Sequence, residues 1–89
     1  MATWVKDPNA ILDYKWDYAS WLEPGDTIAA HEVVIVGTVV LGANSHDDTS
    51  VTAWLSGGTE GERARVTVRV TTVDGRVDDR TSVVDVRSR

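Results

Sequence analysis

The chain has 89 residues, a formal net charge of −5 and no cysteine. This length supports one small domain, which buries roughly 60–65% of its unfolded surface, and excludes a second one. Without cysteine we expect neither disulfides nor thiolate metal sites, and the negative charge argues against a nucleic-acid binder, which needs clustered Lys and Arg.

No stretch of the chain approaches the roughly 18 consecutive apolar residues that a membrane helix needs. The opening, Met1-Ala2-Thr3-Trp4, has the composition of neither a signal peptide nor a transit peptide. We therefore expect a soluble protein, made in a reducing cytoplasm, that binds neither a membrane nor nucleic acid.

Residues 1–10 are expected to form an extended segment that leads into the domain. Asp7-Pro8-Asn9 has the composition of a turn, and Pro8 disfavours helix in the residue before it. We expect this segment to dock on another chain, with Trp4 as the best candidate contact and Lys6 as a second. Residues 11–89 are expected to form the folded domain.

Residues 11–22 show the alternation of a strand. Tyr14, Trp16 and Tyr18 share one parity, while charged residues occupy the other, so we expect the three rings to point inward. The apolar residues of this stretch also fit helical spacing, which leaves a short helical turn at residues 19–22 open as an alternative.

The middle of the chain is expected to contain three short strands. Residues 27–36 and 38–41 are rich in β-branched side chains and are separated by Gly37, where a turn or bulge is plausible. We expect a polar loop at residues 42–49 and a further strand at residues 50–55.

The glycine-rich residues 56–61 are expected to cross from one sheet to another. No Gly-Lys-Ser/Thr sequence follows Gly57, Gly58 and Gly61, so they do not form a phosphate-binding loop. We expect Trp54 to pack beneath this crossing.

The last third of the chain predicts a β-hairpin. Residues 65–71 alternate strictly between apolar and polar side chains, as a strand with one buried face requires. A second β-type run follows Asp74-Gly75, and Asp-Gly is one of the strongest short-range signals of a hairpin turn.

The register of this hairpin depends on the length of its loop. A two-residue loop would pair Val66 with Val83, whereas a five-residue loop at residues 73–77 would pair Val66 with Val84. We favour the longer loop, because it buries both Val84 and Val86.

These elements together predict an all-β fold. Short strands separated by turn signals, few helix-like stretches and no alternation of strand with helix are typical of a sandwich. We therefore expect a small antiparallel immunoglobulin-like β-sandwich of about six or seven strands with an extended N-terminal segment.

Catalytic, cofactor and metal sites are not expected. Neither His31 nor His46 lies in a recognisable nucleophile motif, and the two are far apart in the sequence. The acidic pairs Asp47-Asp48 and Asp78-Asp79 lack a calcium-loop pattern, and adjacent strand residues point to opposite faces. We expect a protein that is not an enzyme and that holds no cofactor or metal.

Several blocks, taken in order, resemble one family of small phage virion proteins, the fiber-tail adaptor proteins. The blocks are Asp13-Tyr14, Trp21-Leu22 and Asp26-Thr27-Ile28, then residues 54–59 (WLSGGT), then Val70-Thr71-Thr72, Gly75-Arg76 and Asp78-Asp79-Arg80, and finally Val86. The similarity extends from about residue 6 to residue 87.

The resemblance implies an immunoglobulin-like domain without enzymatic activity, built into the particle of a tailed bacteriophage and made in the host cytoplasm. Its partners would be other phage structural proteins of the tail, the neck or the major capsid shell, with self-association as a further possibility. We expect a tail or neck adaptor first, a capsid decoration protein second, and a carbohydrate- or host-surface-binding module third.

The loop of the closing hairpin is a second place where a partner could bind. Its charged side chains can set the specificity of an interface, and we name Arg76, Asp79 and Arg80 as candidate contacts beside those of the N-terminal segment.

Overall fold

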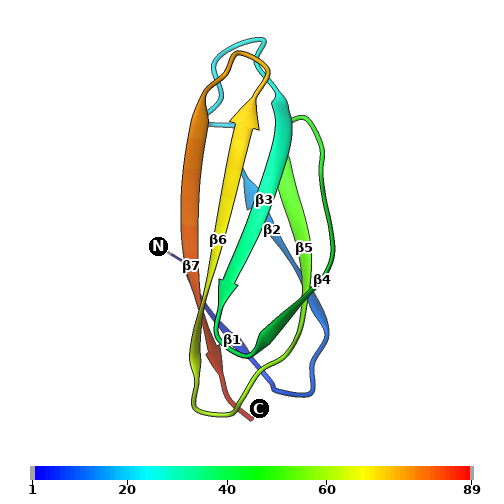
Figure 1. Cartoon of the computed structure of the whole chain (residues 1–89), viewed down its shortest axis with the longest axis vertical. Coiled ribbons are helices and arrows are strands. Elements are labelled where there is room, and N and C mark those ends of the chain that lie inside the picture. Colours follow the sequence, from blue (N-terminus) through cyan, green and yellow to red (C-terminus); the bar gives the residue numbers. More distant parts are fainter. Residues whose placement is uncertain (1, 89) are drawn as a thin grey trace.

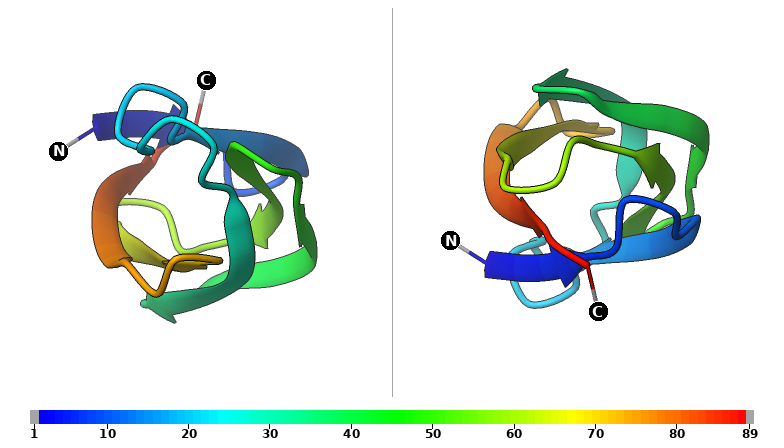
Figure 2. Two further views of the ribbon diagram at one scale, coloured as in Figure 1. Left: turned by 90° about the horizontal axis from the view of Figure 1, so that it is seen from above. Right: turned by 90° about the horizontal axis from the view of Figure 1, so that it is seen from below.

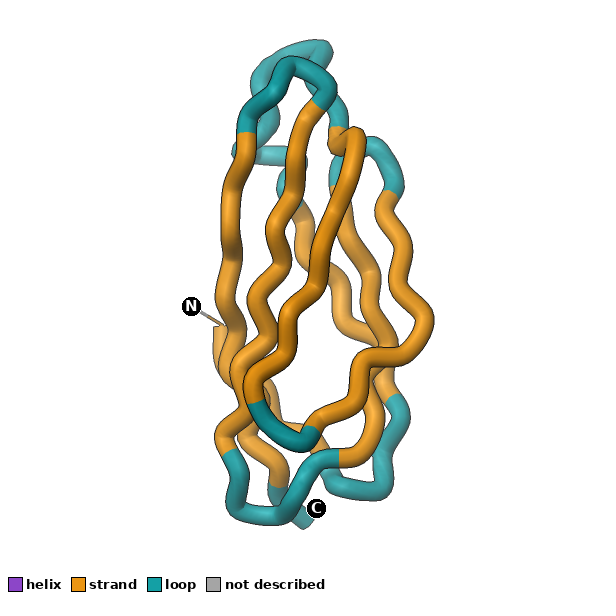
Figure 3. Tube along the Cα trace, in the orientation of Figure 1, coloured by secondary structure: helices purple, strands orange, loops and turns teal. Residues whose placement is uncertain are grey.

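The computed structural model describes residues 2–88, which form seven strands in two facing sheets (Figure 1 and Figure 3). In chain order the strands are β1 (Ala2–Lys6), β2 (Leu12–Asp17), β3 (Ile28–Val36), β4 (Val39–His46), β5 (Ser50–Gly57), β6 (Arg63–Thr72) and β7 (Val77–Val86). The first sheet has the order β1-β7-β6-β3 and the second has the order β2-β5-β4. Within this described part, no helix is long and apolar enough to cross a membrane.

The strand order is that of an immunoglobulin-like sandwich. Strands β2, β5 and β4 take the places of strands B, E and D, and strands β3, β6 and β7 take those of C, F and G. The predicted all-β sandwich is therefore confirmed. One correction concerns β1, which pairs in parallel with β7, whereas the other pairings among the described strands are antiparallel.

The core between the two sheets is made largely of small aliphatic side chains. The fully buried ones on the inner strands β6 and β5 are Ala64, Val66, Val68 and Val70, facing Val51, Ala53 and Leu55. Figure 2 shows the two sheets end-on, facing each other. Every second residue of β6 points inward, which is the periodicity that its sequence predicted.

The aromatic side chains of the β2 region follow the predicted parity. Trp16 and Tyr18 are buried and Tyr14 is partly buried. The chain then makes one helical turn, in which the amide of Leu22 donates to the carbonyl of Tyr18 at 3.0 Å. The strand and the alternative helical turn thus both occur, one after the other.

Trp54 was placed wrongly. Its side chain is 44% exposed, on the outer face of β5, because its neighbours Ala53 and Leu55 both point into the core. A residue between two inward-facing residues of a strand must point outward.

The polar loop predicted at residues 42–49 is confirmed only for residues 47–49. Strand β4 continues to His46, with an irregularity in its pairing with β5 between Leu41 and Asn44. Residues 42–46 are exposed at the edge of the second sheet, so they pair through their backbone without needing apolar side chains.

The closing hairpin has neither of the two registers considered. Val66 lies opposite Ser82, and Ala64 lies opposite Val84. This register is two residues away from the favoured one, so the parity is unchanged and Val84 and Val86 are fully buried, as expected.

A three-residue loop explains this register. The amide of Thr72 donates to the carbonyl of Arg76 at 2.8 Å, and the amide of Arg76 donates to Thr72 Oγ1 at 3.0 Å. Residues 73–75 are further held by the loop before β3, since the amide of Val73 donates to the carbonyl of Thr27 at 3.0 Å. A contact with a residue so far away in the chain was invisible to local turn rules.

The N-terminal residues are extended, but they belong to the sandwich itself. Residues 2–6 form the edge strand β1, whose register runs from Ala2 opposite Ser82 to Lys6 opposite Val86. The structure therefore places this segment as a strand of the first sheet rather than apart from the domain.

The glycine-rich crossing joins the second sheet to the first, as predicted. Gly58 has φ of +102°, and a Cβ atom at this position would lie 2.9 Å from Val86 Cγ2 and 3.2 Å from Val39 Cγ2. The crossing therefore packs directly on the core, where only a residue without a side chain fits.

We predict that Gly58→Ala destabilises the fold more than Gly61→Ala. Both glycines have positive φ, but nothing lies within 4 Å of a Cβ atom at Gly61. The Gly61 variant should lose about 1–2 kcal/mol through backbone strain alone, and the Gly58 variant about 1–3 kcal/mol more through overpacking. Urea denaturation of the two variants measures the difference, and equal losses would contradict the packing role of Gly58.

Candidate docking groove

A hollow of the described surface lies between strands β2 and β7, at the side where the two sheets separate. It has a volume of about 540 Å³. Its apolar wall comes from Trp4 and Trp16, and its charged rim comes from Lys15, Asp17 and Arg80, with Asp79 beside them. A concave apolar surface with a few polar groups on its rim is the usual form of a binding site.

Contacts among three rings hold the apolar wall of the groove in place. Trp4 stacks on Tyr14 with ring centroids 4.5 Å apart, and it meets Trp16 edge-on at 5.3 Å. Trp16 Nε1 donates to Ser82 Oγ at 3.2 Å, which joins β2 to β7 beneath the groove. The wall is therefore fixed by packing and by a buried hydrogen bond before any partner arrives.

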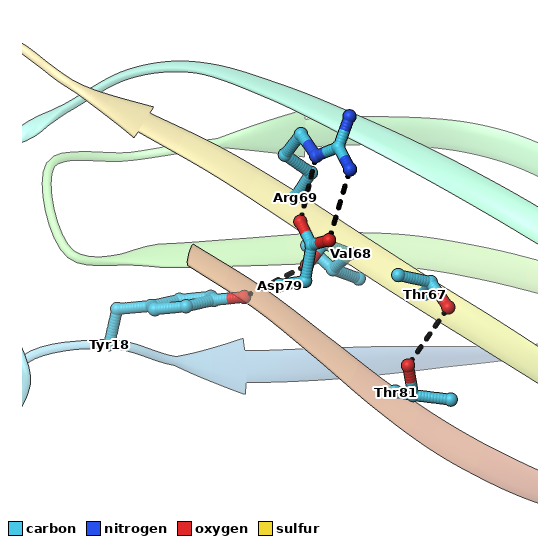
Figure 4. A network of polar contacts seen from close by, with 6 residues as sticks. All are labelled: Tyr18, Thr67, Val68, Arg69, Asp79 and Thr81. Carbon is cyan, nitrogen blue, oxygen red and sulfur yellow. Dashed lines mark hydrogen bonds and ion pairs between the residues drawn. The ribbon is translucent and has the colours of Figure 1, made fainter. Parts of the chain in front are cut away.

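The upper end of the groove is closed by Arg80. Its guanidinium lies 4.0 Å from the centroid of the Tyr18 ring, and its Nη1 donates to the carbonyl of Asp17 at 2.6 Å. Tyr18 Oη in turn donates to the carbonyl of Val68 at 3.3 Å (Figure 4). Burial raises the pKa of the Tyr18 phenol to about 12, although the charge of Arg80 opposes this shift.

Asp79 points to the outer face of the first sheet. Its carboxylate accepts two hydrogen bonds from Arg69, at 2.8 and 3.0 Å (Figure 4). These bonds hold the pKa of the Asp79 carboxyl below its usual range. Next to them Thr67 and Thr81 share a hydrogen bond of 3.0 Å between their hydroxyl groups. The exposed ion pair and the half-buried hydroxyl pair both join β6 to β7.

The backbone edge of β7 beside the groove is open. Strand β1 pairs with residues 82–86 only, so in the described chain no strand lies against residues 77–81 on the side away from β6. Figure 1 shows β1 beside the lower part of β7. An open strand edge can pair with a strand of another chain.

The structure brings together three of the five residues that the sequence named as partner contacts. Trp4, Asp79 and Arg80 all border the groove, although they are distant in the sequence. The residues Lys15, Asp17 and Trp16 were not named. The alternation of β2 indicated which way these side chains point. No pattern within the β2 sequence, however, showed that β2 is an edge strand next to β7.

Arg76 lies at the upper end of the sandwich, outside the groove. Its guanidinium is 4.7 Å from the centroid of the Trp21 ring, and Nη1 is 3.5 Å from Glu23 Oε1. It therefore ties the hairpin loop to the loop that precedes β3.

Lys6 is fully buried, which leaves it no surface with which to contact a partner. Its Nζ donates to the carbonyl of Gly57 at 2.7 Å and to that of Asp7 at 2.9 Å. Burial lowers the pKa of the Lys6 ammonium, and the charge of Asp7 opposes this shift. The side chain instead links β1 to the end of β5, across the two sheets.

Groups of three or more His, Cys, Asp or Glu side chains that could hold a metal ion are absent from the described residues. The residues of the groove offer aromatic faces, charges and an open backbone edge. These features suit recognition of another chain.

One family model matches most of the chain. It is described as Podophage GP4 fiber-tail adaptor protein gp77, and it matches residues 6–85. No curated protein matches the chain. The family resemblance predicted from the sequence is confirmed by this match.

We predict that Tyr18 makes the stability of the fold depend on pH in the alkaline range. The pKa of Tyr18 is about 12 in the folded chain, against an ordinary value of about 10. The contribution of the neutral phenol is fully present below about pH 10 and is lost as the pH rises toward about 12. Urea denaturation at several pH values measures this loss.

Tyr18→Phe serves as the control, because it keeps the ring and removes the ionisable hydroxyl. The free energy of unfolding of the wild type relative to this variant should stay constant below about pH 10 and fall above it. Parallel curves for the two proteins up to about pH 12 would show that Tyr18 ionises as freely in the folded chain as in the unfolded one.

Proposed function

The chain belongs to the family of podophage fiber-tail adaptor proteins, structural components of the virion, and on this premise we propose that it is a non-enzymatic subunit that docks through its β2–β7 groove. It would be made in the host cytoplasm and join the tail or neck during assembly, with another phage structural protein as its partner. The single observation that supports this docking mode is the open edge of β7 beside the aromatic groove.

Strand addition is the mode of docking that this site favours. A partner strand placed in line with β1 would pair with residues 77–81 of β7 and extend the first sheet. Alternate side chains of that strand would point toward the groove, where Trp4 and Trp16 offer an apolar wall. Backbone pairing would supply affinity, and the side chains in the groove would supply specificity.

The charges on the rim would select the partner sequence. Lys15 and Arg80 carry positive charge and Asp17 carries negative charge at the same opening. Arg80 is already held between the Tyr18 ring and the carbonyl of Asp17, so its position is fixed before docking. A partner with an acidic residue near this end of its strand would match the guanidinium.

We predict that the chain is present in each virion in about the number of copies that a ring at the tail or neck holds. A capsid decoration protein, the alternative location, would instead be present in hundreds of copies. Quantitative mass spectrometry of purified virions, relative to the major capsid protein, measures this ratio. A ratio near one copy per capsid subunit would contradict the adaptor role and favour decoration.

We predict that Asp79→Pro strongly lowers incorporation into the virion, whereas Asp79→Ala does not. Arg76 and Val86 each lie in a hydrogen-bonded pair with β6, and in an antiparallel ladder such pairs alternate along the strand. Asp79 is an odd number of residues from both, so its amide points away from β6, to the open edge. Proline removes this donor without breaking a bond to β6. The missing hydrogen-bond donor and the added bulk of the proline ring should together lower incorporation by about tenfold or more.

Both substitutions remove the ion pair with Arg69, so their comparison isolates the backbone effect. The variants would be supplied in trans during infection by a phage that lacks its own copy, after thermal denaturation has shown that both are folded. Equal incorporation of the two folded variants would exclude strand addition at residues 77–81. It would not contradict a location at the tail or neck, which the copy number tests separately.

A further inference from the structure

The side of the sandwich formed by β3 and β4 carries two histidines in direct contact. His31 lies on β3 of the first sheet and His46 at the end of β4 of the second. Their Nδ1 atoms are 2.6 Å apart, and their ring centroids are 4.9 Å apart with the rings inclined at 76°. The fold thus joins the two histidines, which are distant in the sequence, across the edge between the sheets.

Asn44 fixes the orientation and the tautomer of His31. Its Oδ1 lies 2.7 Å from His31 Nε2, and an amide oxygen can only accept, so Nε2 carries the proton. Asn44 is held in turn, because its Nδ2 donates to the carbonyl of Gly42 at 3.1 Å. In the neutral ring of His31 the lone pair is therefore on Nδ1, the atom that faces His46.

The pair shares one proton between two nitrogens that are both good metal ligands. With His31 Nδ1 as the acceptor, His46 Nδ1 must donate. An ion that takes the place of this shared proton would be bound by both Nδ1 atoms, and the proton would move to Nε2 of His46. Both rings stay neutral in this exchange, so no net release of protons is required.

We propose that His31 and His46 form a two-nitrogen site for a divalent transition-metal ion such as Cu²⁺, Ni²⁺ or Zn²⁺. Imidazole nitrogen suits these ions, whereas Mg²⁺ and Ca²⁺ prefer oxygen. Asn44 would act as the outer partner that orients a metal-bound histidine, a role that such ligands commonly require.

The geometry needs only a small adjustment. Metal–nitrogen distances of about 2.0–2.1 Å place two nitrogens of one tetrahedral ion roughly 3.3 Å apart, slightly more than the 2.6 Å of the pair. His46 is exposed at the end of an edge strand that already carries a pairing irregularity, so its ring can move outward. Water would complete the coordination sphere.

Asp47, which follows His46 in the sequence, accepts hydrogen bonds from its own loop instead. Its Oδ1 accepts hydrogen bonds from the amides of Thr49 and Ser50 and from Ser50 Oγ. Two histidines and water therefore define the site, and a bound ion would clip β3 of one sheet to β4 of the other. This inference does not depend on the docking role.

The test uses the full chain without a polyhistidine tag. Isothermal titration with CuCl₂, NiCl₂ or ZnCl₂ should show one site per chain, and MgCl₂ should show none. His31→Gln and His46→Gln should each weaken binding by about tenfold or more, because each removes one of two ligands. Asn44→Ala should weaken it less, since it removes only the orienting partner.

A second measurement identifies which histidine nitrogens bind the metal ion. In nuclear magnetic resonance spectra of the wild type, addition of ZnCl₂ should shift the Nδ1 signals of both histidines. Absence of binding by all three transition metals at millimolar concentration would overturn the proposal. Binding that persists unchanged in both glutamine variants, as at the N-terminal amine, would overturn it equally.

Discussion

The structure depends on one constraint, which is that two sheets must close on a core that lacks both phenylalanine and disulfides. Valine and alanine supply most of the buried contacts between β5 and β6, and these side chains are short. The backbones of the two sheets must therefore approach closely, and every connection between them must lie tightly on the core. The crossing at Gly58 is an example, since a Cβ atom at this position would collide with Val86 and crowd Val39. The large buried rings lie beside the groove, where Trp16 forms part of the wall and Tyr18 lies under Arg80.

How much of the fold could be predicted depended on whether a strand has one buried face. Strand β6 was recognised because its alternation is imposed by the core, and β7 kept its inward parity for the same reason. Parity alone cannot distinguish registers that differ by two residues, and the choice was made by the contact of Val73 with Thr27. The end of β4 could not be recognised at all, because residues 42–46 are exposed and carry no pattern.

The candidate site was predictable in part, and for a related reason. Trp4, Asp79 and Arg80 were named for their chemistry, and the fold places them around one groove. These residues come together because β1 pairs with β7 and because β2 is an edge strand. Neither pairing can be predicted from a short stretch of the sequence. Lys6 shows the reverse case. A lysine in an extended segment is expected to lie on the surface. The long side chain of Lys6 instead reaches the carbonyl of Gly57 in the other sheet.

The parallel pairing of β1 with β7 has a mechanical consequence. The two strands run in the same direction, so the N-terminal end of β1 and the C-terminal end of β7 lie at opposite ends of their shared ladder (Figure 1). A force that pulls these two ends apart along the strands loads all the hydrogen bonds of the ladder at once, in shear. Peeling one bond after another would need a force across the strands. A domain tethered by its two ends would therefore resist tension along its long axis through β1, the shortest of the strands as described.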